Sequence, residues 1–360
     1  MPRAVIVGGT GQVGLATARR LVGEAWEVTV VSRHAAALPD DCRHIEADAR
    51  DAEKLFAVVG SDTDLLMSCV AFDAAHAECL AQAGRAAGRI VAISSASVYR
   101  DDEGRTLDEA SGRGFPAFSV PLSEKSPTVA PGPETYSTRK VAMESTLLSR
   151  AACPVTILRP CAIHGPESKH AREWWLVKRL LDGRAAIPLA YRGRSQFQTT
   201  SVAAIADAVG RAVAGDLPAI ANVSDADSPT VAQIGRAIMD IMDVRAELIG
   251  LPDAAAYPPK LGATPWSVPL PMIVMGAASA EATYGQSVEP AVRWLVQHVG
   301  NDNWRERLPQ LAAYPVDHFD YEADERALRL PGAASLAALS TNTCPRTGSA
   351  IGCKIVAAIA

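Results

Sequence analysis

Tyr136 and Lys140 are the two residues whose types and spacing best fit acid–base chemistry. Positions four apart share one face of a helix, so the lysine ammonium would lie near the phenol. A nearby cation favours the phenolate and brings a group that titrates near ~10 towards neutral pH. The pattern therefore predicts a general acid or base, and the alternative is an ordinary surface pair at the start of a helix.

Serine hydroxyls form a second candidate group. Ser94, Ser95 and Ser97 come at the end of the apolar run Arg89–Ser94. Doubly wound sheets bind ligands at the carboxyl ends of their strands, where a hydroxyl could hydrogen-bond a substrate carbonyl. Serines at such positions also commonly form turns, so this pattern leaves both interpretations open.

A glycine-rich segment, Gly8–Gly14, directly follows the apolar run Ala4–Val7. Glycines between a strand and a helix let the backbone approach a pyrophosphate, which the helix N-terminus attracts. This context predicts a dinucleotide site. The contacts expected from it are Gly8, Thr10, Gly11, Gln12, Val13 and Gly14.

The end of the next apolar run, Glu27–Val31, indicates which dinucleotide is bound. A carboxylate there would bind the ribose 2′-hydroxyl of NAD, but Ser32 and Arg33 follow instead. A guanidinium matches a 2′-phosphate, so Arg33 favours NADP over NAD. NAD stays the alternative, with Arg33 then a solvated surface residue.

The elements that must position these groups alternate between continuous apolar runs and helical patterns. Such alternation predicts a Rossmann fold, a doubly wound parallel α/β sheet, with a smaller mixed substrate domain after it. The expected strands are 4–7, 27–31, 64–71, 89–94, 155–158 and 220–223. The expected helices are 13–23, 52–59, 74–88, 136–150, 174–181, 201–213 and 231–242.

The domains follow from the same pattern. Residues 1–160 are expected to form the dinucleotide-binding domain, with segments near 195–225 packing onto it. Residues 161–330 are expected to form most of the substrate domain, and 331–360 a loosely ordered tail. Residues 101–134 are rich in Asp, Gly, Ser and Pro and predict a long surface loop, a feature that is more often functional than idle.

Composition excludes several classes of partner. The formal net charge is −5 with no basic stripe, so no nucleic-acid partner is expected. Seven cysteines without a C-x-x-C, and seven scattered histidines, favour a reducing compartment and no metal site. No apolar run reaches the ~20 residues that span a bilayer. We therefore expect a cytoplasmic protein with a small-molecule substrate and no membrane partner, and we leave room for a homodimer.

Taken together, the motifs resemble the extended short-chain dehydrogenase/reductase family, which includes the NAD-dependent epimerase/dehydratases. The resemblance covers about residues 1–325. It rests on Gly8–Gly14, Asp48, Ser94–Tyr99, Tyr136–Lys140 and Arg159–Pro166, in that order along the chain.

The resemblance implies a Ser-Tyr-Lys site. Ser95 would orient the carbonyl or hydroxyl, Tyr136 would move the proton, and Lys140 would lower the pKa of Tyr136 and hold the ribose. The cofactor is also expected to contact Ser32 and Arg33, at the end of the second expected strand. The resemblance adds contacts at Asp48, Ala49, Ala71, Lys140, Pro160 and Ile163.

The chain departs from the family pattern at three places. His164 stands where tyrosine is usual, and a segment is added at Gly104–Phe118. Phe197 stands near the arginine that binds the diphosphate in sugar-nucleotide epimerases, with Arg192 and Arg194 close by. The sequence favours an NADP-dependent oxidoreductase that reduces a carbonyl or oxidises an alcohol of a small organic substrate. The alternatives are a nucleotide-sugar epimerase or dehydratase with tightly bound NAD, and a non-catalytic cofactor- or RNA-associated protein.

Overall fold

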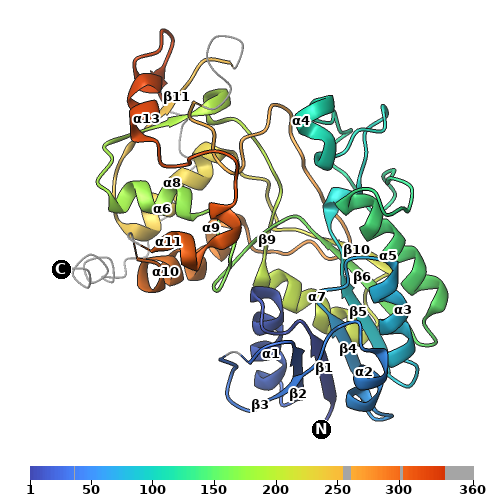
Figure 1. The fold of residues 1–360 in the computed structure, drawn as a ribbon. Helices are drawn as coiled ribbons and strands as arrows, with labels where there is room; N and C mark the ends of the chain where they lie inside the picture. The colour runs from blue at the N-terminus through green and yellow to red at the C-terminus, as the bar shows by residue number, and fades with distance from the viewer. Residues whose placement is uncertain (36, 254–260, 301–302, 337–360) are drawn as a thin grey trace. The chain divides into compact units, whose positions relative to one another are not determined.

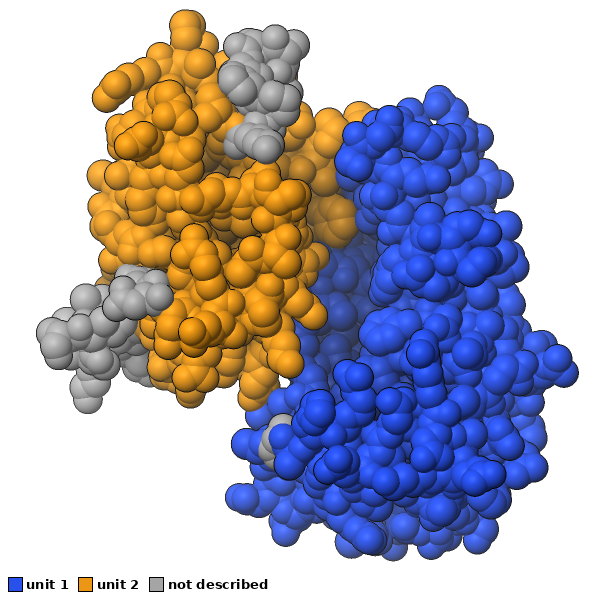
Figure 2. Space-filling view, in the orientation of Figure 1, with its two compact units in different colours: residues 1–163, 198–227, 272–283 blue, residues 164–197, 228–271, 284–360 orange. Residues whose placement is uncertain are grey.

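The computed structural model describes residues 1–35, 37–253, 261–300 and 303–336. These residues form two compact units, coloured separately in Figure 2. Unit 1 consists of 1–163, 198–227 and 272–283, and unit 2 of 164–197, 228–271 and the chain from 284 onward. The first boundary lies at Ile163, where the sequence suggested about residue 160, and the segment 198–227 belongs to unit 1.

Unit 1 is built on a seven-stranded sheet in which all paired neighbours run parallel. Its order is β10-β6-β5-β4-β1-β2-β3. The strands are β1 Arg3–Val7, β2 Glu27–Ser32, β3 Cys42–Glu46, β4 Leu65–Ser68, β5 Arg89–Ile93, β6 Val155–Pro160 and β10 Ile220–Val223. Strands β2 and β3 are added on one side of β1, and β4, β5, β6 and β10 on the other. The switch point between β1 and β4 is where a sheet of this kind is expected to bind a ligand. The predicted fold class is confirmed.

Helices cover both faces of this sheet (Figure 1). Helices α1 Gln12–Gly23 and α7 Val202–Ala214 pack on one face, where their apolar residues share a core with the sheet. Helices α2 Ala52–Val59, α3 Ala74–Ala83 and α5 Tyr136–Arg150 pack on the other. Strands buried between two helix layers must be apolar on both sides, which explains their continuous apolar runs.

Shorter elements follow the carboxyl ends of the strands. They are the 3₁₀ turns η1 Ala96–Val98 and η2 Leu107–Glu109, helix α4 Ala110–Arg113, and the paired strands β7 Ala162–His164 and β9 Thr199–Ser201.

Unit 2 contains a three-stranded sheet of order β12-β11-β8 and several helices. The strands are β8 Ala186–Leu189, β11 Glu247–Gly250 and β12 Ala334–Ser335, with the turn η3 Ala190–Gly193 after β8. The helices are α6 Trp174–Leu181, α8 Val231–Met242, α9 Tyr284–Ser287, α10 Glu289–His298, α11 Trp304–Arg307, α12 Pro309–Ala312 and α13 Tyr321–Leu328.

Three local expectations differ from the structure. Strand β3 was missed, because Cys42–Glu46 is half exposed at the sheet edge and has no continuous apolar run. Helix α3 ends at Ala83 instead of residue 88, because Gly84 caps it. A loose tail was expected from residue 331, but residues 334–336 are hydrogen-bonded to unit 2: β12 pairs with β11, and Leu336 N–H donates to Leu248 O. The rest of that tail, 337–360, lies outside the described residues.

Within the described ranges, no helix is long and apolar enough to cross a membrane. In the same residues no three His, Cys, Asp or Glu side chains gather as metal ligands would. The cysteines described there, Cys42, Cys69, Cys79, Cys153 and Cys161, are free thiols.

Candidate functional site

The glycines of the loop after β1 differ in the space around them. Gly8 and Gly14 are crowded by neighbouring atoms, whereas Gly11 has open space that a ligand could occupy. A Cβ on Gly14 would lie 2.4 Å from Gly9 Cα, and one on Gly8, whose φ is +76°, would lie 2.5 Å from Val70 Cγ1. Gly11 is exposed, and a Cβ there would come no closer than 3.8 Å to Gly8 O. Packing therefore requires Gly8 and Gly14, whereas Gly11 is free to face a ligand.

The N-terminus of α1 offers hydrogen-bond donors to an anion. Gly11 is its N-cap and supplies no side-chain cap, and the first turn carries no acidic residue. Unpaired N–H groups and the helix dipole suit a phosphate group, so the loop fits the diphosphate of the dinucleotide that the sequence predicts.

The ends of β2 and β3 present polar groups beyond the glycine loop. Ser32 Oγ donates to His34 O at 2.7 Å and lies 2.9 Å from His44 Nε2. Arg33 is exposed, and no carboxylate follows β2 before residue 40. Asp48, also exposed, accepts a hydrogen bond from Arg50 N–H at 2.8 Å, so its carboxylate turns the chain after β3.

Lys140 joins the ends of two central strands. Its ammonium donates to Ala71 O at 2.7 Å, just after β4, and to Ile93 O at 2.9 Å, the last residue of β5. The side chain is only 2% exposed, and burial lowers its pKa to about 8 although Glu144 and Cys69 act in the opposite direction. An ammonium has three donors. Two are used by these carbonyls, which leaves one for a ribose hydroxyl.

Tyr136 and Ser95 meet above this lysine. Lys140 Nζ lies 5.8 Å from the Tyr136 ring centroid, and a hydrogen bond joins the Tyr136 and Ser95 side chains. The pKa of Tyr136 is raised above its usual value, first by desolvation and then by the Asp108 carboxylate, with the Ser95 hydrogen bond acting against them. The lowering of this pKa by Lys140 that the resemblance implies is therefore not found. Ser95 also accepts from Ser97 N–H at 3.1 Å, which fixes its side chain at the start of η1. The structure thus brings together the three residues predicted to react.

A buried network supports this trio from below. Arg159, on β6, donates to Glu144 on α5 through Nε (2.9 Å) and Nη2, and to Tyr99 OH through Nη1 (3.2 Å). Ser94 donates its hydroxyl to the same carboxylate, and Tyr99 donates to Asn222 Oδ1 at 2.6 Å. Sequence reasoning missed Glu144, although it lies one helical turn after Lys140 on the same face.

Glu124 extends this network and was also missed. Its Oε1 accepts from Asn222 N–H at 2.9 Å and from Ala277 N–H at 2.8 Å. A Cβ on Gly276 would lie 2.1 Å from that oxygen, so the backbone must approach closely there. Glu124 falls in the segment expected to be a loop, where no periodicity marked it.

Other predicted contact residues have structural environments of their own. Val13 is 8% exposed and belongs to the core beneath α1 and α7, with Ile163 packed against it. Pro160 ends β6, and Ala49 packs against the opposite core. Thr10 lies in the glycine turn. Their cofactor contacts stay predictions.

Two of the departures noted in the sequence, His164 and Phe197, lie in unit 2, and the added segment Gly104–Phe118 lies in unit 1. His164 is buried and packs edge-on against the Tyr284 ring, 5.0 Å between centroids. Arg194 is exposed and pairs with Asp253 at 3.2 Å. Arg192 is also exposed, with φ +54°, and forms no ion pair within the described residues.

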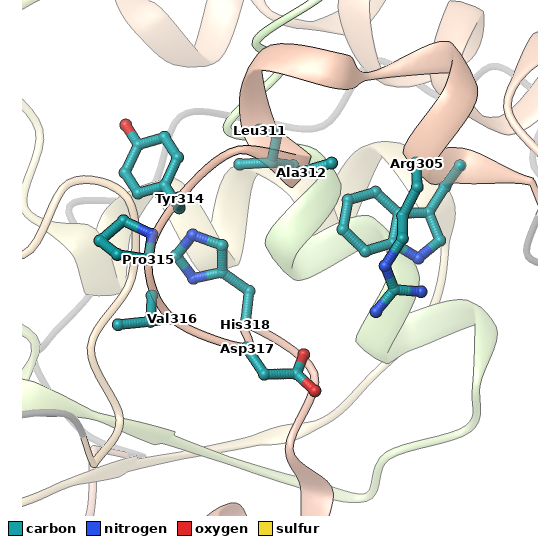
Figure 3. A pocket seen from close by; sticks show the side chains of 9 residues that line it. Arg305, Leu311, Ala312, Tyr314, Pro315, Val316, Asp317 and His318 are labelled. Carbon is teal, nitrogen blue, oxygen red and sulfur yellow. The ribbon is translucent and has the colours of Figure 1, made fainter.

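Two of the cavities among the described residues lie in unit 2. The smaller, of about 140 Å³, is lined by Tyr191, Arg194, Ser195, Gln196, Asp253 and residues 268–271. The larger, of about 320 Å³, is lined by Trp304, Arg305, Leu311, Ala312 and residues 314–318. Figure 3 shows the Arg305 side chain and the His318 ring on opposite sides of it. None of the predicted catalytic or cofactor residues lines either cavity.

The model of the NAD dependent epimerase/dehydratase family matches residues 4–224. The chain belongs to this family. Members are enzymes of the extended short-chain dehydrogenase/reductase type, so the resemblance inferred from the motifs is confirmed. No curated protein sequence matches the chain.

Solved structures with the same fold are epimerase/dehydratase-family proteins of low sequence identity. The UDP-N-acetylglucosamine 4-epimerase of Methanobrevibacter ruminantium, in complex with UDP-N-acetylmuramic acid, is 16% identical at a TM-score of 0.62, covering 82% of this chain and 98% of that one. The enzyme WbmG of Bordetella bronchiseptica, in complex with NAD and UDP, is 17% identical at a TM-score of 0.61, covering 82% of this chain and 94% of that one. The dTDP-glucose 4,6-dehydratase of Bacillus anthracis, in complex with NAD, is 14% identical at a TM-score of 0.61, covering 85% of this chain and 100% of that one. These similarities establish the fold of this family member.

The buried ammonium of Lys140 makes stability depend on pH. Its folded pKa, about 8, lies below the unfolded value near ~10.4, so between them the unfolded chain holds a proton that the folded protein has released. Stability therefore rises with pH across this window. We expect the unfolding free energy of wild type, relative to Lys140→Met, to increase by about 2 kcal/mol from pH 8 to pH 10.

Urea unfolding at several pH values measures this difference. Lys125→Met, at an exposed position, is the control and should track wild type throughout. A difference between wild type and Lys140→Met that stays flat from pH 8 to pH 10 would contradict the lowered pKa.

Proposed function

We propose that the protein is an NAD-dependent epimerase or dehydratase that acts on a nucleotide-linked sugar. Ser95, Tyr136 and Lys140 are its catalytic residues. The observation that carries this proposal is the position of Lys140, which joins the ends of β4 and β5 beneath the paired Tyr136 and Ser95 side chains. Family membership and the solved structures with the same fold favour this function over a dissociable NADP-dependent reductase.

Each catalytic residue has a separate task. Tyr136 accepts the proton of the sugar hydroxyl at its phenolic oxygen as the carbon is oxidised, and returns it to that oxygen when the ketone is reduced from its other face. Ser95 donates a hydrogen bond to the substrate oxygen and holds it beside the phenol. Lys140 supplies positive charge that favours the phenolate. Epimerisation needs one group that both takes and gives a proton, and Tyr136 can do both when a nicotinamide is bound to exchange the hydride. A dehydratase would need a further acid and base for the loss of water.

NAD fits the groups around the glycine loop. When bound, its nicotinamide supplies the hydride chemistry by taking a hydride from the carbinol carbon and giving it back. Gly11 and the amides that open α1 would hold the diphosphate, and the third N–H of Lys140 would hold the nicotinamide ribose. Asp48 would contact the adenine.

Arg192 is the residue we propose for the substrate diphosphate. Phe197 cannot bind an anion, and Arg194 already pairs with Asp253. Arg192 is exposed and forms no ion pair among the described residues. Tyr191 and Arg192 both have positive φ, and strained backbone of this kind is common where a chain presents a binding group.

A second candidate function is an NADP-dependent reductase of a small carbonyl compound. Arg33 favours it, because this exposed guanidinium follows β2, where NAD-binding proteins of this fold usually carry a carboxylate. The two candidates differ in cofactor turnover: an epimerase or dehydratase returns its hydride to the same substrate, whereas a reductase exchanges its cofactor.

Denaturing the purified protein and identifying any released nicotinamide by mass separates the candidates. Stoichiometric NAD, followed by NMR detection of a new epimer or a 4-keto sugar from UDP- or dTDP-sugars, is the expected result. An empty protein that binds NADPH more tightly than NADH would favour the reductase, and Arg33→Ala should then weaken only NADPH binding. Failure to bind either cofactor would contradict both candidates.

Two glycine substitutions test the loop itself. Gly14→Ala places a methyl group against Gly9 and should lower the unfolding free energy by about 1–3 kcal/mol. Gly11→Ala meets open space and should cost less than about 1 kcal/mol, but its methyl group faces the diphosphate and should weaken NAD binding at least about tenfold. Thermal unfolding and calorimetric titration measure the two effects. Unchanged NAD affinity in Gly11→Ala would contradict the proposed diphosphate site.

A further inference from the structure

The added segment between Asp101 and Phe118 is closed by one buried carboxylate. Asp101, 4% exposed, accepts from Arg105 N–H (2.8 Å), Arg105 Nε (2.7 Å), Glu103 N–H (3.1 Å) and Ala117 N–H (3.0 Å). Burial would raise its pKa, but the hydrogen bonds from Arg105 and Ala117 lower it to about 2. The carboxylate is therefore ionised at neutral pH, and it ties both ends of the segment together.

The same segment reaches the first turn of the catalytic helix. Asp108, on η2, accepts a hydrogen bond from Ser137 N–H at 2.7 Å. Ser137 is fully buried and donates its hydroxyl to Ser97 O at 2.8 Å, so this turn is held from two sides. The N-cap Thr135 already accepts from Thr138 N–H, and α5 has no acidic residue in its first turn. Asp108 thus supplies the negative charge that the helix N-terminus favours.

Asp108, an exposed residue, binds the amide next to Tyr136 in the chain, and its charge raises the pKa of the phenol. The charged groups around the Tyr136 phenol in the described residues are Lys140 on its own helix and Asp108 from the added segment. Lys140 is itself faced by Glu144, Cys69 and Asp73. The lysine favours the phenolate and the aspartate disfavours it, so the two act on Tyr136 in opposite directions.

We propose that Asp108 is a positioning residue for Tyr136, fixing the first turn of α5 by its hydrogen bond to Ser137 and setting the electrostatic potential at the phenol by its charge. The catalytic helix of this protein is then tuned by the segment between Asp101 and Phe118. The proposal rests on the role of Tyr136 under the proposed function, but its first test does not need a substrate.

The test compares Asp108→Asn with Glu109→Gln. Asparagine keeps an acceptor oxygen for Ser137 N–H and removes only the charge. Glu109 is the neighbouring carboxylate on η2 and pairs with Arg113 at 3.0 Å, which makes it the matched control. Tyrosine labelled with ¹³C at Cζ reports each phenol titration by NMR, and the signal lost in Tyr136→Phe identifies Tyr136.

We expect the Tyr136 titration to move to lower pH by about half a pH unit in Asp108→Asn and to stay in place in Glu109→Gln. A titration that does not move in Asp108→Asn, or that moves equally in Glu109→Gln, would overturn the proposal whatever the substrate is.

Activity provides the second readout. With a turned-over substrate, the acidic limb of the kcat/KM profile for the oxidative step should move to lower pH in Asp108→Asn, in step with the NMR titration. A limb that stays in place while the NMR titration moves would also overturn the proposal. If the titration moves as expected but no nucleotide sugar is converted, the proposed function fails and the positioning of Tyr136 by Asp108 stands.

Discussion

Tyr136→Phe is expected to lower kcat by about 10²-fold or more, because it removes the only proton that the reacting phenol can exchange. The phenyl ring keeps its position over Lys140, and the side chain is 37% exposed, so little stability is at stake. Lys140 keeps both backbone acceptors and its free donor in the variant. Affinity for NAD should therefore stay within a factor of about two.

Steady-state kinetics and calorimetric titration of NAD measure these two quantities. Tyr314→Phe is the matched control: it removes a phenol that bonds His170 at 2.8 Å beside the larger cavity of unit 2, and kcat should not change. Equal turnover in wild type and Tyr136→Phe would exclude the phenol from proton transfer. A loss of NAD binding that accounts for the whole effect would assign Tyr136 to the cofactor site instead.

Much of unit 1 could be predicted because its elements have strong local signals. Helices α2 and α5 begin and end where their periodicity and capping residues place them, and α6 and α8 in unit 2 also have their expected bounds. The parallel strands are marked by continuous apolar runs. Strand β3 could not be found in this way, because an edge strand with one exposed face has only a weak pattern.

The supporting groups of the site were harder to predict, because they depend on contacts between distant segments. Ser137 follows Asp108 by 29 residues, and Asn222 follows Tyr99 by 123. Neither separation has a periodicity that could reveal it. Glu144 is the exception: a carboxylate four residues after Lys140 on the same helix face was visible, but only the structure shows that Arg159 neutralises it.

Arg159→Met is expected to lower the unfolding free energy by about 3–5 kcal/mol, the largest loss of stability that we predict. Arg159 and Glu144 are each at most 3% exposed, and two guanidinium nitrogens bind the carboxylate. Methionine fills similar space but leaves a buried carboxylate with Ser94 as its remaining hydrogen-bond donor among the described residues. The cost is that of a buried carboxylate that has lost its paired guanidinium and keeps only the charge of Lys140 near it, and it exceeds what the ion pair itself contributes.

Urea unfolding of Arg159→Met, Glu144→Gln and the double variant forms a cycle that isolates this charge. Removing the carboxylate charge should recover part of the stability, so the double variant is expected to be more stable than Arg159→Met alone. Arg150→Met, which breaks an exposed ion pair with Glu78 near the end of the same helix, should cost less than about 1 kcal/mol. If Arg159→Met cost no more than Arg150→Met, the buried network would not hold α5 against β6. The position of Lys140 beneath Tyr136 would then have to come from its two backbone acceptors alone.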